Sequence, residues 1–102
     1  YPDHDLDHFQ SNVEGELVNA LQAADGLYVG VVFNAGGYTH TSVALRDCIA
    51  AIKVPVIEVH LSDPMKREAF RHISYVGMAA HSCFAGHGAK SYELALDAAA
   101  RL

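Results

Sequence analysis

The sequence predicts an α/β domain with an open parallel β-sheet and helices on both of its faces. Two observations support this fold class. Continuous apolar runs at 27–33 and 56–61 are typical of strands that are buried on both sides. Segments with apolar residues at helical spacing alternate with these runs. Strands and helices that alternate in this way build a parallel sheet through right-handed crossovers.

The composition is that of one folded domain. The 102 residues suit a single domain, 1–102, with one small core. A hydrophobic fraction of 51% and a charged fraction of 19% exclude a disordered chain. The net charge of −5 argues against a nucleic-acid-binding or anionic-membrane surface, and no apolar run approaches the roughly 18 residues of a membrane span. Cys48 and Cys83 fit the reducing cytoplasm better than a disulfide scaffold.

The amino-terminal third is expected to hold a strand, a helix and a second strand. Residues 6–11 suggest a short strand with mixed faces. Asn12 is a suitable cap for a helix that runs to about Ala24, because two acidic residues would then lie in its first turn, where the helix dipole favours them. Asp25 and the glycine after it end that helix, and the apolar run 27–33 follows as a buried strand.

The middle of the chain predicts a loop, a helix and a strand. The loop contains Gly36 and Gly37, and either Thr41 or Ser42 caps a helix that extends to about residue 52. The expected apolar stripe of this helix consists of Val43, Ala44, Cys48, Ala51 and Ile52. Pro55 interrupts the helical pattern, so that the run 56–61 forms the next strand.

The carboxy-terminal third predicts a short helix, a strand and a closing helix. The short helix lies around 64–70 and the strand at 78–85, where Cys83 would be a packing residue. An amphipathic helix over 91–102 then closes the domain. Its inward residues are expected to be Leu94, Ala95, Ala98 and Leu102.

Ligands of parallel sheets bind beyond the carboxyl ends of the strands, where this sequence has polar residues. The first such end has Asn34, whose amide both donates and accepts, two glycines that permit a tight turn, and His40 next to a helix N-terminus that favours anions. The alternative interpretation is a simple turn with a capping Thr41 and a surface histidine.

The second strand end has Glu58, His60 and Ser62. The period of a strand places Glu58 and His60 on the same face, where the carboxylate can orient the imidazole for acid–base work. Ser62 and the backbone N–H groups around it could hold a carboxylate. A hydrogen-bonded polar pair without a catalytic role explains the same two residues.

Two arginines follow this strand. Arg67 and Arg71 stand four residues apart, on one face if the segment is helical, and either could bind an anionic substrate bidentately. The alternative is a solvated basic face. Asp47, in the second helix beside Arg46, is on local grounds an exposed acid.

Other site chemistries lack their patterns. No histidine pair has metal spacing on a helix, since His4 and His8 lie in extended sequence without a third ligand nearby. The sequence has no nucleophile elbow, phosphate-binding loop or dinucleotide fingerprint. The residues alone therefore predict an acid–base site for a small anionic molecule, without metal or cofactor.

Four segments of the chain carry a resemblance to a known family. These are 10–17 (QSNVEGEL), 34–47 (NAGGYTHTSVALRD), 58–62 (EVHLS) and 67–75 (REAFRHISY). Together they resemble the type II dehydroquinases, the small 3-dehydroquinate dehydratases of the shikimate pathway. The resemblance extends over nearly the whole chain, and its second segment is long and specific.

The resemblance implies a flavodoxin-like fold and a hydro-lyase activity without metal or cofactor. Family members convert 3-dehydroquinate to 3-dehydroshikimate by anti elimination of water through an enolate. His60 would be the general acid, oriented by Glu58. The substrate would contact the side chains of Asn34, His40, Ser62 and Arg71 and the backbone N–H groups of Leu61 and Ser62.

The resemblance also implies an assembly. Asp47 matches an acid that reaches the site of a neighbouring subunit across a trimer interface, in homo-oligomers that are commonly dodecamers. The chain departs from the family pattern at Asp63, where Asn is usual, and at residues 65–66, where His-Ala is frequent.

The family's first, central strand and its lid are absent from this chain. The lid carries the tyrosine that abstracts the proton and a supporting arginine, and Tyr1 does not match that tyrosine because it precedes a different element. We expect this chain to be the carboxy-terminal major part of the enzyme. The amino-terminal segment would be supplied by another chain, retained after cleavage or left out of the recorded sequence; otherwise the sheet is rearranged.

Two other functions compete with this hypothesis. A non-catalytic remnant would keep assembly and ligand binding but lack the lid tyrosine. A receiver-like signalling domain shares the fold class, but it needs acidic residues at its strand ends, where this sequence has Asn34 and His60.

Overall fold

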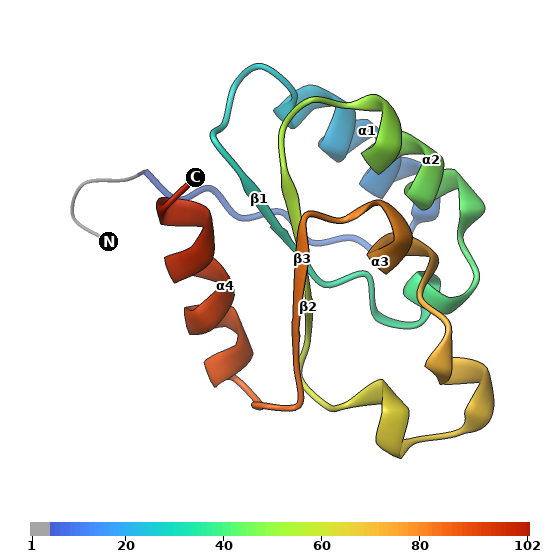
Figure 1. Cartoon of the computed structure of the whole chain (residues 1–102). Helices are drawn as coiled ribbons and strands as arrows, with labels where there is room; N and C mark the ends of the chain where they lie inside the picture. Colours follow the sequence, from blue (N-terminus) through green and yellow to red (C-terminus); the bar gives the residue numbers. More distant parts are fainter. Residues whose placement is uncertain (1–4) are drawn as a thin grey trace.

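A computed structural model describes residues 5–102 of the chain (Figure 1). The helices and strands follow one another as α1 (Glu14–Ala24), β1 (Val31–Phe33), α2 (Val43–Ala51), β2 (Val56–His60), α3 (Tyr75–Ala79), β3 (Ser82–Ala85) and α4 (Lys90–Ala100). Short 3₁₀ helices form at Gly36–His40, Pro64–Lys66 and Ala69–His72. The interpretations of Tyr1 and His4 fall outside the described residues.

The three strands form a parallel sheet in the order β1-β2-β3, which confirms the predicted sheet type. Strand β2 is central, with Ile57 aligned with Val32 on one side and with Ser82 on the other. All five residues of β2 are buried, as expected for a strand that is paired on both edges and covered on both faces.

Helices cover both faces of the sheet, as predicted. Figure 1 shows α4 on one side of the strands and the other three helices on the opposite side. Ile57 and Val59 of β2 pack with Ala95 of α4. Val56 faces the other way and packs with residues of α1, α2 and α3 in the larger core cluster. Because side chains alternate along a strand, Glu58 and His60 lie on the same face as Val56.

Helix α2 begins where the sequence predicts. The Ser42 hydroxyl accepts a hydrogen bond from the backbone N–H of Leu45 at 2.9 Å, which confirms one of the two expected caps. The predicted apolar stripe is wrong in part, because Val43, Ala44 and Ala51 are exposed. The buried face consists of Leu45, Cys48 and Ile49. These residues pack with apolar side chains of α1 and α3, and this contact decides which side of an almost uniformly apolar helix turns inward.

Two positions on α2 test this assignment. Leu45→Ala is expected to lower the free energy of unfolding by about 2–5 kcal/mol, since Leu45 is fully buried and the truncation leaves a cavity. Val43→Ala, two residues away and about half exposed, should change it by less than about 1 kcal/mol. Urea unfolding measures both. Equal losses would contradict the buried face described above.

Two predicted strand segments do not form. Residues 6–11 have no regular structure, and β1 begins only at Val31, so that 27–30 lie outside the sheet. Leu27 and Val29 are largely exposed instead of buried. The physical reason is that a strand requires a neighbour for its N–H and C=O groups, and β1 pairs with β2 alone among the described residues.

Several predicted boundaries also shift. Asn12 does not cap α1; Val13 occupies that position, and its N–H donates to the Ser11 hydroxyl. Asp25 ends the helix as expected, and its carboxylate also accepts backbone N–H groups before β2. The first residues of the predicted strand 78–85 belong to α3, whose cap is Ser74. Helix α4 spans Lys90–Ala100 and buries Ala95, while Leu102 lies beyond it and is exposed.

None of the helices formed by residues 5–102 combines the length and the apolar character needed to cross a membrane.

Candidate active site

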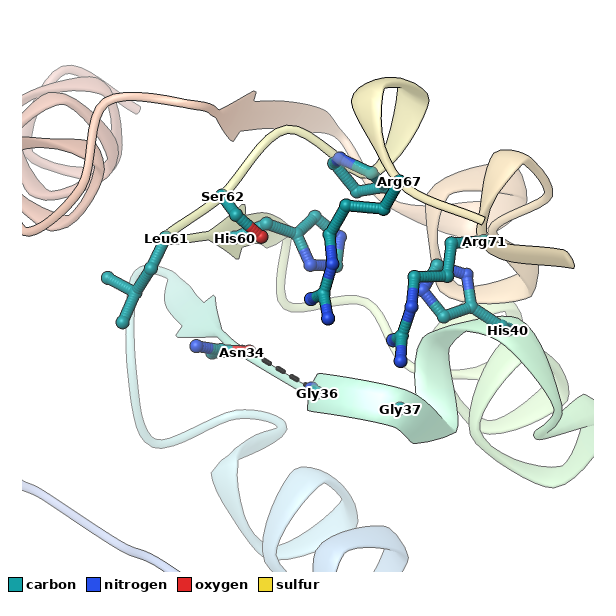
Figure 2. Close-up of a pocket in the computed structure, with 10 residues that line it drawn as sticks. Asn34, Gly36, Gly37, His40, His60, Leu61, Ser62, Arg67 and Arg71 are labelled. Carbon is teal, nitrogen blue, oxygen red and sulfur yellow. Dashed lines mark hydrogen bonds between the residues drawn. The ribbon is translucent and has the colours of Figure 1, made fainter. Parts of the chain in front are cut away.

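A cavity of about 190 Å³ opens beyond the carboxyl ends of β1 and β2, where the rule for parallel sheets places ligands (Figure 2). It is lined by Asn34, Gly36, Gly37, His40, His60, Leu61, Ser62, Pro64, Arg67 and Arg71. The structure thus brings together six of the eight predicted site residues. The other two lie elsewhere: Glu58 sits behind His60, and Asp47 lies on α2.

The loop after β1 positions Asn34. Its side-chain oxygen accepts the N–H of Gly36 at 3.0 Å, and its amide nitrogen donates to the Tyr92 hydroxyl of α4 at 3.1 Å. Gly36 has a φ of +59°, a conformation that residues with a Cβ rarely adopt. The expected loop forms a 3₁₀ helix, Gly36–His40. The N–H of its first residue holds the side chain of Asn34 at the edge of the cavity.

The same 3₁₀ helix holds His40 against the segment before α3. Ring atom Nδ1 of His40 lies 2.8 Å from the carbonyl oxygen of Ile73. Because a carbonyl only accepts, Nδ1 carries the proton, and Nε2 remains available to a ligand. The rings of His40 and His60 are stacked, with centroids 6.3 Å apart and planes at 13°.

His60 and Glu58 form the pair that the period of β2 predicts. Nε2 of His60 lies 2.8 Å from Oε2 of Glu58, and both residues are buried. Burial by itself would raise the pKa of Glu58, but hydrogen bonds from His60, Ser74 and Thr39 and the charge of His60 outweigh it and lower that pKa to about 2. Glu58 is therefore a carboxylate that holds Nε2–H of His60, and Nδ1 is the nitrogen left for proton exchange.

Two guanidinium groups make the cavity suitable for an anion. Figure 2 shows Arg67 and Arg71 directed into it, beside His60 and His40. Arg71 is held by Glu68, whose Oε2 accepts its Nε–H at 2.6 Å, while Arg67 lies 3.9 Å from the same oxygen. The single helix that was predicted for this segment is wrong: the two arginines come from neighbouring short turns that bend toward the same space.

Asp47 lies on the exposed side of α2, where its carboxylate pairs with Arg46 at 2.8 Å. It does not line the cavity of its own chain. The local interpretation of this residue as an exposed helical acid agrees with its position.

One group of potential metal ligands occurs within residues 5–102: Glu58, His60 and Cys83, whose ligand atoms lie within 4.8 Å of one another. The donor set fits a metal poorly, since Oε2 of Glu58 already accepts three hydrogen bonds. Partial desolvation of the sulfur, together with the charge and hydrogen bond of Glu58, raises the pKa of Cys83 to about 12, so that its sulfur keeps its proton at neutral pH. Cys83 is also exposed instead of being the packing residue that was predicted.

Sequence reasoning missed Thr39 and Ser74. Both hydroxyl groups lie 2.5 Å from Oε2 of Glu58. Ser74 was detectable as a helix cap, because its hydroxyl also accepts the N–H of Gly77 three residues later. Its contact with Glu58, 16 residues away in sequence, depends on how α3 packs against β2.

Comparisons with known proteins identify the family of this chain. The sequence model of the family described as dehydroquinase class II matches residues 2–100. The chain is 56% identical over 91 residues to the 3-dehydroquinate dehydratase of Ruegeria pomeroyi, covering 89% of this chain and 61% of that protein. It is 50% identical over 98 residues to that of Corynebacterium glutamicum, covering 96% and 68%.

Solved structures show the same likeness. The type II dehydroquinase from Butyrivibrio crossotus superposes with a TM-score of 0.85 at 40% identity, covering 89% of this chain and 64% of that one. The enzyme from Propionibacterium acnes gives 0.86 at 34% identity, covering 91% and 68%. This chain spans about 60% of the length of the R. pomeroyi relative. Since the family match includes nearly every residue and the fold is shared, the chain belongs to the dehydroquinase class II family.

Proposed function

We propose that this chain is the carboxy-terminal major part of a type II 3-dehydroquinate dehydratase, which removes water from 3-dehydroquinate to give 3-dehydroshikimate. One observation carries the proposal. The buried Glu58–His60 pair ends at a cavity that also presents Asn34, His40 and Arg71, in a chain of this family. The cavity thus offers an acid, polar groups for hydroxyls and a cation for a carboxylate.

The elimination requires a base and an acid on opposite sides of the substrate. A tyrosine of the amino-terminal part removes a proton next to the carbonyl group and forms an enolate. The enolate then expels the hydroxyl group, and His60 donates a proton to the departing oxygen so that it leaves as water. Glu58 keeps the imidazole in place and stabilises its charged form. Neither step requires a metal or another cofactor.

The remaining residues bind the substrate. Asn34, His40 and Ser62 line the cavity and would contact its hydroxyl groups. Arg71 lines the same cavity and would bind its carboxylate, together with the backbone N–H groups of Leu61 and Ser62. Arg67 lines the same cavity and adds positive charge to it.

The proposal includes an assembly. Asp47 would reach the site of a neighbouring subunit, as its exposed position on α2 permits. The chain would then work as a homo-oligomer, a trimer-based dodecamer, in the cytoplasm and in the shikimate pathway.

An amino-terminal segment would complete the enzyme. Its strand would pair with the edge of β1 that has no neighbour among the described residues, and its lid would carry the tyrosine and an arginine. The greater length of the R. pomeroyi relative supports this part of the proposal. Intact mass spectrometry would detect the segment as a companion peptide. A single folded species near 11.0 kDa would contradict it.

The function is tested in a "completed chain", made by joining the part of the R. pomeroyi relative that precedes its match to the amino terminus of this chain. We expect this protein to form 3-dehydroshikimate from 3-dehydroquinate, followed by ultraviolet absorbance, and the 102 residues alone to form none. An inactive completed chain that still binds 3-dehydroquinate would instead support the non-catalytic remnant. Activity of the 102 residues alone would show that another residue is the base.

A further inference from the structure

The carboxylate of Glu58 is held by groups from several elements besides its own strand. Its Oε2 receives the Thr39 hydroxyl from the 3₁₀ helix at 2.5 Å and the Ser74 hydroxyl from the cap of α3 at 2.5 Å. The third contact is Nε2 of His60 at 2.8 Å. A buried carboxylate is costly unless such donors satisfy it, so these contacts decide whether Glu58 can remain charged beside His60.

The hydroxyl protons have defined directions. Ser74 Oγ accepts the N–H of Gly77 at 2.9 Å, which leaves its own proton to donate. Thr39 Oγ1 lies 2.9 Å from Ser74 Oγ and 2.5 Å from Oε2 of Glu58. Since a carboxylate has no proton to give, both hydroxyls can satisfy it only as donors. We call Thr39 and Ser74 the hydroxyl pair.

The other carboxylate oxygen is confined by α3. A Cβ added at Gly77 would lie 2.9 Å from Oε1 of Glu58 and 3.1 Å from Ser74 Oγ. The backbone of the first turn of α3 therefore lies directly against the carboxylate. The hydroxyl pair on one oxygen and this turn beside the other together define the plane of the carboxylate.

The same two segments also hold the second histidine. Thr39 precedes His40, and Ser74 follows Ile73, whose carbonyl oxygen accepts Nδ1–H of His40 at 2.8 Å. One junction between the 3₁₀ helix and the start of α3 thus orients His40 directly and His60 through Glu58. The stacked arrangement of the two rings follows from it.

From this geometry we propose that Thr39 and Ser74 are positioning residues: their hydroxyl groups fix the carboxylate of Glu58 in the orientation in which it accepts Nε2–H of His60. Neither residue lines the cavity, so neither would touch the substrate. Only the expected effect on kcat rests on the proposed function. The orientation of the His60 ring can be measured without turnover.

The test uses Thr39→Val, which keeps the shape of the side chain and removes the hydroxyl group, in the completed chain. The ¹⁵N chemical shifts of His60 should show that the Nδ1–H tautomer, absent before, becomes populated. The kcat should fall about tenfold with KM changed less than about twofold, the size expected for losing a hydrogen bond to a charged group. Thr39→Ser keeps the hydroxyl and should restore both measurements.

Ser74→Ala is a second variant, in case Thr39→Val does not fold, and it should change the two measurements in the same direction. Thr41→Val is the matched control: this exposed threonine lies two residues from Thr39, outside the hydroxyl pair, and its loss should change neither. Unchanged ¹⁵N shifts and an unchanged kcat in a folded Thr39→Val or Ser74→Ala protein would overturn the proposal. If the completed chain has no turnover, the proposed function fails, and the ¹⁵N shifts still decide the role of the hydroxyl pair.

Discussion

Replacement of His60 by alanine is expected to lower kcat of the completed chain by about 10²–10⁴-fold without changing its assembly state. His60 is the only residue lining the described cavity whose ring is held by a buried carboxylate, through the 2.8 Å contact between Nε2 and Oε2 of Glu58. Without the imidazole, the departing hydroxyl group would have to leave unprotonated. KM should change much less than kcat, because the proposed substrate contacts of Asn34 and Arg71 would remain.

The measurement is the initial rate of ultraviolet absorbance change, combined with size-exclusion chromatography to verify the assembly. His81→Ala is the control, since His81 is exposed and lies outside the cavity, and it should keep the rate of the unaltered protein. Retained turnover in the His60→Ala protein would refute the role of His60 as the general acid.

Acid is expected to destabilise the fold through Glu58. The pKa of this carboxyl is lowered from its ordinary value of 4.5 to about 2 in the folded chain. A group whose pKa falls on folding adds stability that is complete above its unfolded value and is lost as pH falls toward the folded value. The stabilisation is therefore present above about pH 4.5 and decreases below it, by about 3 kcal/mol in total.

Urea unfolding of the completed chain between about pH 6 and about pH 3 measures this loss. In the Glu58→Gln protein the free energy of unfolding should depend less steeply on pH, because the titrating group is gone. Glu14→Gln, at the start of α1, is the control, and its free energy of unfolding should vary with pH as in the unaltered protein. Parallel curves for the unaltered and Glu58→Gln proteins would contradict the assignment.

The two predictions examine different consequences of one contact. The first concerns what His60 does for a substrate, and the second what its partner Glu58 does for the fold. A carboxylate kept charged in a buried place is available to stabilise an imidazolium when the proton moves. Failure of the first prediction with success of the second would leave the pair as a structural feature.

Much of the cavity could be predicted because it depends on strand ends and on a period of two. Asn34 follows β1, and Glu58 and His60 alternate along β2, so a parallel sheet brings Asn34 and His60 to the same edge. Arg67 and Arg71 do line one cavity, but the single helix predicted to bring them together does not form. They come from two short turns instead of one helix, and their convergence is decided by how the chain bends after β2.

The predicted strands failed where pairing was needed. Residues 27–30 belong to the same apolar run as Val31–Phe33, yet only the latter have a partner, β2. Residues 6–11 likewise remain without regular structure. Apolar character shows that a segment can be buried, but hydrogen bonding to a neighbouring strand decides whether it becomes one.

The sequence by itself determined the parallel α/β class, a cap for α2 at either Thr41 or Ser42, the shared face of Glu58 and His60, and the family. These features depend on local spacing or on motifs that the chain carries intact. Only the tertiary structure decided that Thr39 and Ser74 meet Glu58, and that Cys83 faces the same carboxylate. The physical reason is that such contacts join residues from separate elements, whose distance in space is set by packing between helix and sheet and not by spacing along the chain.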